Sequence, residues 1–219
     1  MRGIQLVMLV MSIMMVVLGV DVAVGADIKQ DIKQNAQPLQ RIQDVIEDGK
    51  AYILANKDTV SEAELSFKLR EIVAPTFDFR EMAKRCLGKN WSDGTDTQQR
   101  EFIDLFSEML ADSYMKKIVK GIDTAEIKYP SDAVEMEGNK ATVKMMISSG
   151  GETASVHYRL LQRTDSSWWV YDVVIENIGL VSNYRTEFSD IIRRNGFDGL
   201  IKMLKERIEK MKKENEKTS

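Results

Sequence analysis

The spacing of apolar residues changes twice along this chain, and no other feature restricts its fold so strongly. Over residues 27–121 apolar side chains recur every three or four positions, which predicts amphipathic helices. Over residues 122–176 they alternate with polar ones, which predicts strands, and over residues 177–213 the helical spacing returns. We therefore predict an α+β fold. A twisted antiparallel sheet of about four strands should pack against a helical layer and enclose an apolar cavity.

These three stretches are expected to form one domain over residues 27–213, followed by a charged tail at 214–219. A chain of 219 residues suits a single domain and can bury a sizeable core. The formal net charge of −3 argues against a nucleic-acid partner, because such proteins present an excess of basic residues. We expect a monomer.

The first 26 residues have the pattern of a secretory signal peptide. Arg2 precedes an uncharged apolar run at residues 4–20, and Val24 and Ala26 then form a small-residue cleavage site. Cleavage after Ala26 is expected. An uncleaved membrane anchor is the alternative, although seventeen apolar residues are at the lower limit for spanning a bilayer. Removal of this segment takes away one basic and one acidic residue, so the net charge is unchanged.

The cysteine content indicates the compartment. Cys86 is the only cysteine, so no intramolecular disulfide can form. A secreted chain of this kind must be stabilised by its core, which fits a bacterial periplasm better than a eukaryotic secretory route.

Capping and breaking residues predict where several helices begin and end. Ser61 and Glu64 form a capping box that should begin one helix. Pro38 cannot donate a helical hydrogen bond and is expected in the first turn of the first main helix. The Asn195-Gly196 pair should end the helix that follows the sheet, and Asp198 should cap the next one.

Few residues could support catalysis. His157 is the only histidine and is expected on the solvent face of its strand, while Cys86 lies on the apolar side of a short helix. Asp78, Asp172 and Glu176 could act as general bases beside an apolar cavity. Asp78 is also expected to cap a helix, and strand alternation places Asp172 on the surface. We therefore expect no catalytic centre, no metal and no cofactor.

Several segments together carry a family resemblance. They are FDF at 77–79, LG at 87–88, QQREF at 98–102, VYDVVIENI at 170–178, LVSNYR at 180–185 and GFDGL at 196–200. In their order and spacing they resemble the MlaC family, also called the toluene-tolerance auxiliary family, over about residues 35–210. Asn177 stands where many members have glycine.

The resemblance implies a periplasmic phospholipid carrier of the pathway that maintains outer-membrane lipid asymmetry. The acyl chains would lie in an apolar pocket with the headgroup outward. The implied partners are an inner-membrane ABC transporter complex and an outer-membrane lipoprotein complex. About 30 buried CH₂ groups at about 0.8 kcal/mol each oppose the transfer of such a lipid from a membrane into water, so a carrier must offer an equivalent apolar cavity.

We predict the lipid-binding residues from the inward faces of the sheet and its flanking helices. They are Met82, Leu110, Tyr114, Met145, Val156, Tyr158, Tyr171, Val173, Val181, Tyr184, Phe188 and Ile192. From the pattern alone, an ordinary filled core at these positions is favoured over a pocket lining, and periodicity cannot separate the two. Two other functions therefore stay open: an enzyme that acts on a hydrophobic substrate through a pocket carboxylate, and a periplasmic adaptor without a ligand.

Overall fold

The computed structural model describes residues 26–121 and 124–216. The signal-peptide prediction falls almost entirely on residues 1–25 and the end of the charged tail on 217–219, so these lie outside the described residues. No helix among the described residues has both the length and the apolar character needed to cross a membrane.

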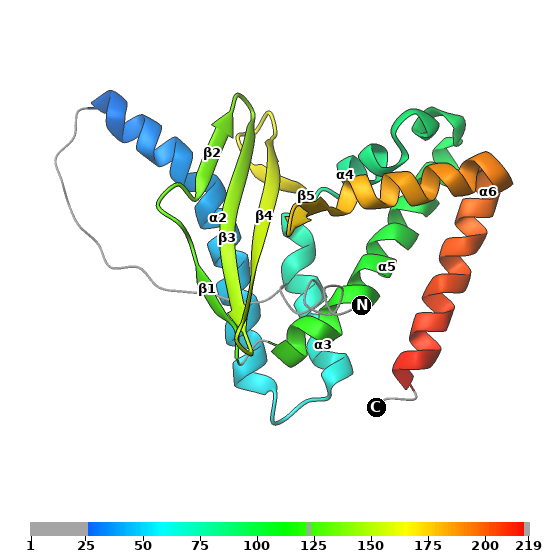
Figure 1. The fold of residues 1–219 in the computed structure, drawn as a ribbon, viewed down its shortest axis with the longest axis horizontal. Helices are drawn as coiled ribbons and strands as arrows, with labels where there is room; N and C mark the ends of the chain where they lie inside the picture. Colours follow the sequence, from blue (N-terminus) through cyan, green and yellow to red (C-terminus); the bar gives the residue numbers. More distant parts are fainter. Residues whose placement is uncertain (1–25, 122–123, 217–219) are drawn as a thin grey trace.

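Helices occupy the two ends of the described chain and strands its middle (Figure 1). The helices before the sheet are α2 (Ala26–Asn56), α3 (Glu62–Val73), η1 (Ala74–Thr76), α4 (Phe79–Leu87), η2 (Gly88–Asp93) and α5 (Asp96–Gly121). A single element, α6 (Leu180–Glu216), follows the sheet. Ser61 caps α3 as predicted, because its hydroxyl accepts a hydrogen bond from the backbone N–H of Glu64 at 3.2 Å.

The sheet is antiparallel throughout, which confirms the predicted α+β class. Its strands are β1 (Glu126–Lys128), β2 (Val134–Glu137), β3 (Lys140–Ser149), β4 (Glu152–Gln162), β5 (Trp168–Ile175) and β6 (Ile178–Gly179). The described residues thus contain six strands rather than about four. The additional strands are short: β1 and β2 pair with different halves of β3, and β6 has only two residues.

The turn between β5 and β6 explains one departure from the family pattern. Glu176 and Asn177 have positive φ angles of 48° and 65°. Two such residues in succession are typical of a type I′ hairpin turn, in which glycine and asparagine are preferred. Asn177 can therefore occupy a position where many family members have glycine.

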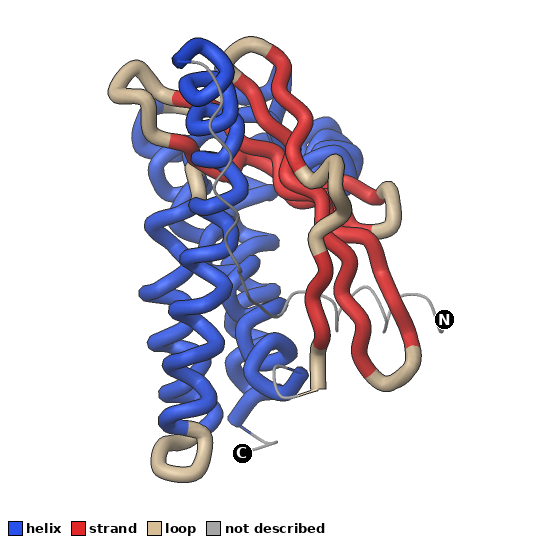
Figure 2. The backbone as a smooth tube through the Cα atoms, turned by 90° about the vertical axis from the view of Figure 1, so that its left-hand side faces the viewer, coloured by secondary structure: helices blue, strands red, loops and turns tan. Residues whose placement is uncertain are grey.

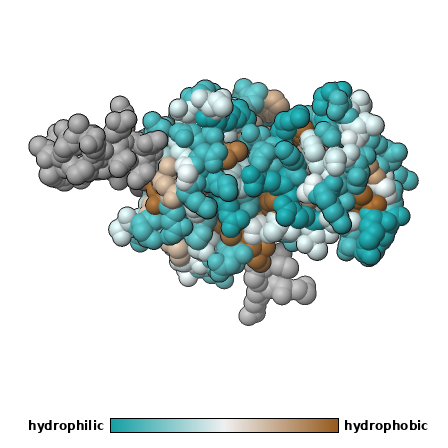
Figure 3. All heavy atoms as spheres, turned by 90° about the horizontal axis from the view of Figure 1, so that it is seen from above, coloured by the Kyte–Doolittle hydropathy of each residue, from teal (hydrophilic) through white to brown (hydrophobic). Residues whose placement is uncertain are grey.

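The core consists of two clusters of buried residues. One fills the space between the sheet and α2, α3 and α5, and the other lies among α4, α5 and α6 and includes Tyr171 of β5. Figure 2 shows the curved sheet mainly on the right and most of the helices on the left, with some helix behind the strands at the upper right. The face seen in Figure 3 is largely hydrophilic, with hydrophobic atoms visible only in small areas.

The position of Pro38 differs from the sequence prediction, whereas the break near Gly196 agrees with it. Helix α2 begins at Ala26, so Pro38 lies inside it rather than in its first turn. Helix α6 bends at Gly196, where φ is 70° and ψ is −178°, as the predicted break requires. The cap predicted at Asp198 stays a prediction. The Asp198 carboxylate accepts a hydrogen bond from Gln98 at 2.6 Å and links α6 to the beginning of α5.

Candidate ligand-binding pocket

An apolar pocket lies between the helices and the inner face of the sheet. Its wall comes mainly from α2, α3, η1, α4 and α5, with single residues from β4, β5 and the start of α6. The lining residues are Ile42, Val45, Ile46, Gly49, Lys50, Leu69, Arg70, Val73, Ala74, Thr76, Phe77, Phe79, Met82, Ser107, Leu110, Ala111, Tyr114, Met115, Ile118, Tyr158, Val173 and Leu180. The space free of atoms, its open mouth included, is about 960 Å³.

The apolar faces of the helices predicted from the sequence form much of this wall. On α2 the residues Ile42, Val45, Ile46 and Gly49 follow the i, i+3, i+4, i+7 spacing that places side chains on one helix face. Gly49 allows α3 to approach, because a Cβ at this position would lie 2.9 Å from Cδ1 of Leu69. A larger residue there would have to push the Leu69 side chain away.

The polar groups in the wall are few. Lys50 and Arg70 are half-buried cations, and Thr76 and Ser107 contribute hydroxyls. No aspartate or glutamate is among the lining residues that the structure describes. Within the same part of the chain, no three His, Cys, Asp or Glu side chains are grouped so that they could hold a metal ion.

Two tyrosines bring phenol groups to the pocket. Burial raises the pKa of Tyr158 to about 12. Burial also raises the pKa of Tyr114, and this effect outweighs the hydrogen bond with Tyr184, which lowers it. Both phenols are therefore neutral at physiological pH. They can act as hydrogen-bond donors but not as anionic bases.

One rim of the pocket is a short crossing segment, residues 74–78, that joins α3 to α4. Its residue Phe77 forms a parallel bridge with Val170 of β5, and the backbone N–H of Asp78 donates to the Val170 carbonyl at 2.8 Å. Since Ala74, Thr76 and Phe77 line the pocket, these contacts fix the distance between the helical wall and the sheet.

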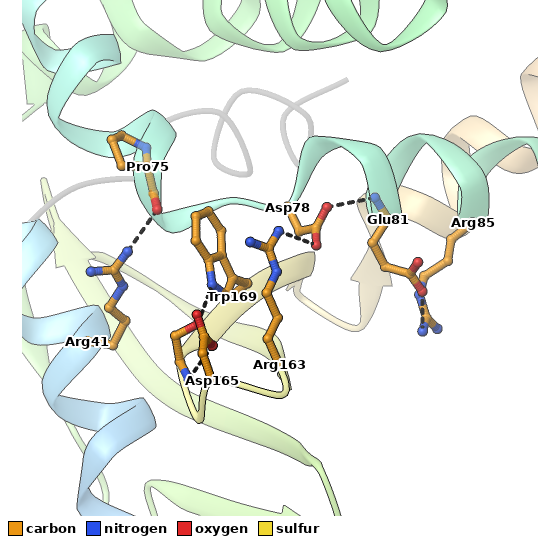
Figure 4. A network of polar contacts seen from close by, with 9 residues as sticks. Arg41, Pro75, Asp78, Glu81, Arg85, Arg163, Asp165 and Trp169 are labelled. Atoms are coloured by element: carbon orange, nitrogen blue, oxygen red, sulfur yellow. Dashed lines mark hydrogen bonds and ion pairs between the residues drawn. The ribbon is translucent and has the colours of Figure 1, made fainter. Parts of the chain in front are cut away.

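Polar side chains contact the crossing segment near both of its ends, at Pro75 and at Asp78 (Figure 4). Arg41 of α2 donates to the Pro75 carbonyl at 2.8 Å. Asp78 accepts from Arg163 at 2.8 Å, and the Arg163 guanidinium lies 3.7 Å from the ring centroid of Trp169. Asp78 also caps α4, as the sequence predicted. A carboxylate engaged with a helix end and an arginine has a structural role here.

The structure places five of the predicted lipid-binding residues in the pocket wall: Met82, Leu110, Tyr114, Tyr158 and Val173. Met145 and Val156 are buried in the cluster between sheet and helices without lining the pocket. Tyr171, Val181, Tyr184, Phe188 and Ile192 belong to the second cluster. There the rings of Phe106, Tyr184 and Phe188 pack against one another with centroids 5.2–5.9 Å apart. As lipid contacts, all twelve stay predictions.

The α2 and α3 residues of the wall are missing from the predicted set. Ile42, Ile46, Leu69 and Val73 all lie on the apolar stripes visible in the sequence. The stripes indicate a buried helix face, but not whether that face meets a filled core or an open pocket. Hydrophobic periodicity alone therefore contains no signal that could have selected them.

The remaining candidate catalytic carboxylates do not line the pocket. Asp172 is buried, with 3% of its surface exposed, which corrects the surface position expected from strand alternation. Its carboxylate accepts from the backbone N–H of Val181 at 3.0 Å and from Arg159 at 3.1 Å. Glu176 is exposed and accepts from the hydroxyl of Ser155 at 3.0 Å. These contacts give both carboxylates structural partners.

His157 and Cys86 also lie outside the pocket wall. His157 is half-buried on the outer face of β4, and burial, followed by the nearby charge of Lys144, lowers its pKa. Cys86 is fully buried in the second cluster, as expected from its position on a short helix. Burial raises the pKa of its thiol, so the reactive thiolate is disfavoured.

Comparison with known proteins agrees with this architecture. The structure resembles a phospholipid-binding protein from Ralstonia solanacearum, solved in complex with a phospholipid at 1.53 Å resolution. The sequences are 24% identical, the TM-score is 0.71, and the match covers 81% of this chain and 98% of that protein. The sequence profile of the family described as MlaC protein matches residues 27–206. The chain therefore belongs to the MlaC family.

Proposed function

We propose that this chain is a periplasmic phospholipid-binding protein that carries glycerophospholipids between inner- and outer-membrane complexes. The acyl chains would occupy the pocket between α2, α3, α5 and the sheet. Family membership and the phospholipid bound to the Ralstonia solanacearum protein support a phospholipid as the ligand. The signal-peptide pattern of the first 26 residues supports a periplasmic location.

The observation that carries the proposal is the pocket itself. Its wall is almost entirely aliphatic and aromatic, as expected of a site that holds an apolar ligand. Such a wall can replace the hydrocarbon surroundings that an acyl chain loses when it leaves a membrane. The wall lacks a carboxylate in the described residues, so it favours holding a ligand over transforming it.

The direct test is to purify the mature protein from bacterial periplasm without detergent and measure its mass by native mass spectrometry, followed by lipid extraction. We expect bound phospholipid and no chemical change of it during incubation. A mass without ligand, together with failure to load from phospholipid vesicles, would contradict the proposal and favour the adaptor function. Turnover of a bound lipid would favour the enzyme.

A variant that fills the pocket tests whether the lipid binds there. Ala111 lines the pocket on α5, so Ala111→Phe should occupy part of its volume and reduce bound lipid at least about tenfold, which corresponds to about 1.4 kcal/mol. Ala63 is exposed on α3 and does not line the pocket, so Ala63→Phe is the matched control. Undiminished lipid in folded Ala111→Phe would place the ligand elsewhere.

A further inference from the structure

The apolar pocket contains an unbalanced pair of positive charges. Lys50 of α2 and Arg70 of α3 are the charged residues of its wall, and no acidic residue among the described lining residues faces them. Both side chains are half-buried, so each can keep its charged end at the rim while its aliphatic part lies along the apolar wall.

The two cations start from neighbouring points on adjacent helices. Lys50 directly follows Gly49 and Arg70 directly follows Leu69, and α2 and α3 come close together there, because a Cβ on Gly49 would lie 2.9 Å from Cδ1 of Leu69. Both then line the same pocket. A single anionic group at the rim between these helices could therefore contact both side chains.

Neither side chain is engaged elsewhere. Within the described part of the chain, Lys50 and Arg70 form no side-chain hydrogen bond and no ion pair. Some lysines elsewhere are paired: Lys120 with Glu62 at 3.3 Å and Lys205 with Glu101 at 2.6 Å. The free donors of Lys50 and Arg70 are thus available to a ligand.

The charge of Arg70 acts on Asp112, but Asp112 is a weak counter-charge. It lies outside the pocket wall and forms no ion pair with Arg70 within 4.0 Å. Burial raises the pKa of Asp112, because its carboxylate is poorly solvated, and one carboxylate oxygen is buried without a hydrogen-bond partner. The positive charge at the rim is therefore not neutralised from this side.

We propose that Lys50 and Arg70 bind the phosphate of the bound lipid and make the pocket selective for anionic phospholipids over zwitterionic ones. This inference rests on the proposed function. Phosphate oxygens accept charge-assisted hydrogen bonds from guanidinium and ammonium groups. A zwitterionic headgroup brings an additional ammonium group, which two neighbouring cations repel. The acyl chains contribute affinity without distinguishing the headgroups.

The test loads delipidated mature protein from vesicles that contain equal amounts of phosphatidylglycerol and phosphatidylethanolamine with identical acyl chains. Native mass spectrometry then gives the ratio of the two bound lipids. We expect phosphatidylglycerol to predominate. In Lys50→Gln/Arg70→Gln this ratio should fall about tenfold, the equivalent of about 1.4 kcal/mol, while phosphatidylethanolamine still loads. The control Arg193→Gln/Lys202→Gln removes the same charge from exposed positions of α6 and should keep the wild-type ratio.

A salt titration tests the same inference without any substitution. Shortening the Debye length from about 10 Å to about 3 Å should reduce the wild-type preference, because half-exposed charges are screened. Equal loading of both lipids by wild type, or an unchanged ratio in Lys50→Gln/Arg70→Gln, would overturn the inference. The inference would also be overturned if inorganic phosphate bound the lipid-free protein without changing the ratio of the two bound lipids. Failure to load either lipid would instead contradict the proposed function.

Discussion

At the scale of single residues, Asp172 shows how a strand carboxylate can serve the fold. Its side chain joins the first turn of α6 to β4, through Val181 and Arg159, from a buried position. Asp172→Ala should lower the free energy of unfolding by about 2 kcal/mol, because the Val181 N–H loses its acceptor and Arg159 its partner. Urea denaturation measures this. Asp190→Ala, which removes an exposed pair with Arg193, should cost less than about 1 kcal/mol. Equal costs would refute the role given to Asp172.

The ionisation of Asp112 should make the stability of the protein depend on pH. The sign of this dependence is opposite to that of a carboxylate in an ion pair. Burial raises its pKa above the usual 3.8, so the folded state binds a proton more readily than the unfolded chain. The contribution of Asp112 to stability therefore falls as pH rises from the unfolded value through the raised one. Asp112→Asn should stabilise the protein at neutral pH, by at most about 1 kcal/mol because the group is partly exposed. The gain should vanish below the usual pKa. Urea titrations at both pH values measure it, and a loss of stability at neutral pH would contradict the argument.

At the scale of elements, Gly196 sets the shape of α6. Its φ of 70° with ψ of −178° belongs to a region that only glycine occupies without strain. A Cβ there would meet no atom within 4 Å, so the effect of a substitution is confined to the backbone. Gly196→Ala should reduce the free energy of unfolding by about 1–3 kcal/mol in urea. Lys202→Ala, exposed in the same helix, should be nearly neutral. An alanine variant as stable as wild type would show that the bend does not depend on glycine.

At the scale of the whole molecule, the pocket couples lipid binding to stability. A ligand that binds only the folded state adds about 2.7 kcal/mol at a concentration 100 times its Kd. Removing the lipid should therefore lower the Tm by roughly 5 °C or more for a domain of this size. Differential scanning calorimetry of loaded and delipidated protein measures the shift. The Ala111→Phe variant should show little difference between the two preparations. Identical Tm values for loaded and delipidated wild type would contradict a ligand held in this pocket.

Features that depend on neighbouring residues could be predicted from the sequence, whereas features that depend on contacts between elements could not. Local spacing predicted the order of helices and strands, the cap at Ser61 and the break near Gly196, because these depend on neighbouring residues. Alternation failed at Asp172, since β6 and the start of α6 cover the outer side of β5 there. A Cβ on Gly179 would lie 3.2 Å from the Asp172 carboxylate. Contacts of this kind arise between elements, and no strand pattern contains them.

The sequence by itself determined the class of fold and the supply of apolar surface, because hydrophobic periodicity and capping act within a few residues of one another. Only the tertiary structure decided which apolar faces stay open. Tyr184 and Phe188 pack into a filled aromatic cluster, whereas Tyr158 and Val173 face a pocket. The difference depends on the spacing of whole elements. The close approach of α2 and α3 at Gly49 and the contacts that hold residues 74–78 to β5 are part of that spacing. Lys50 and Arg70 line the same pocket for the same reason, although twenty positions separate them in the chain.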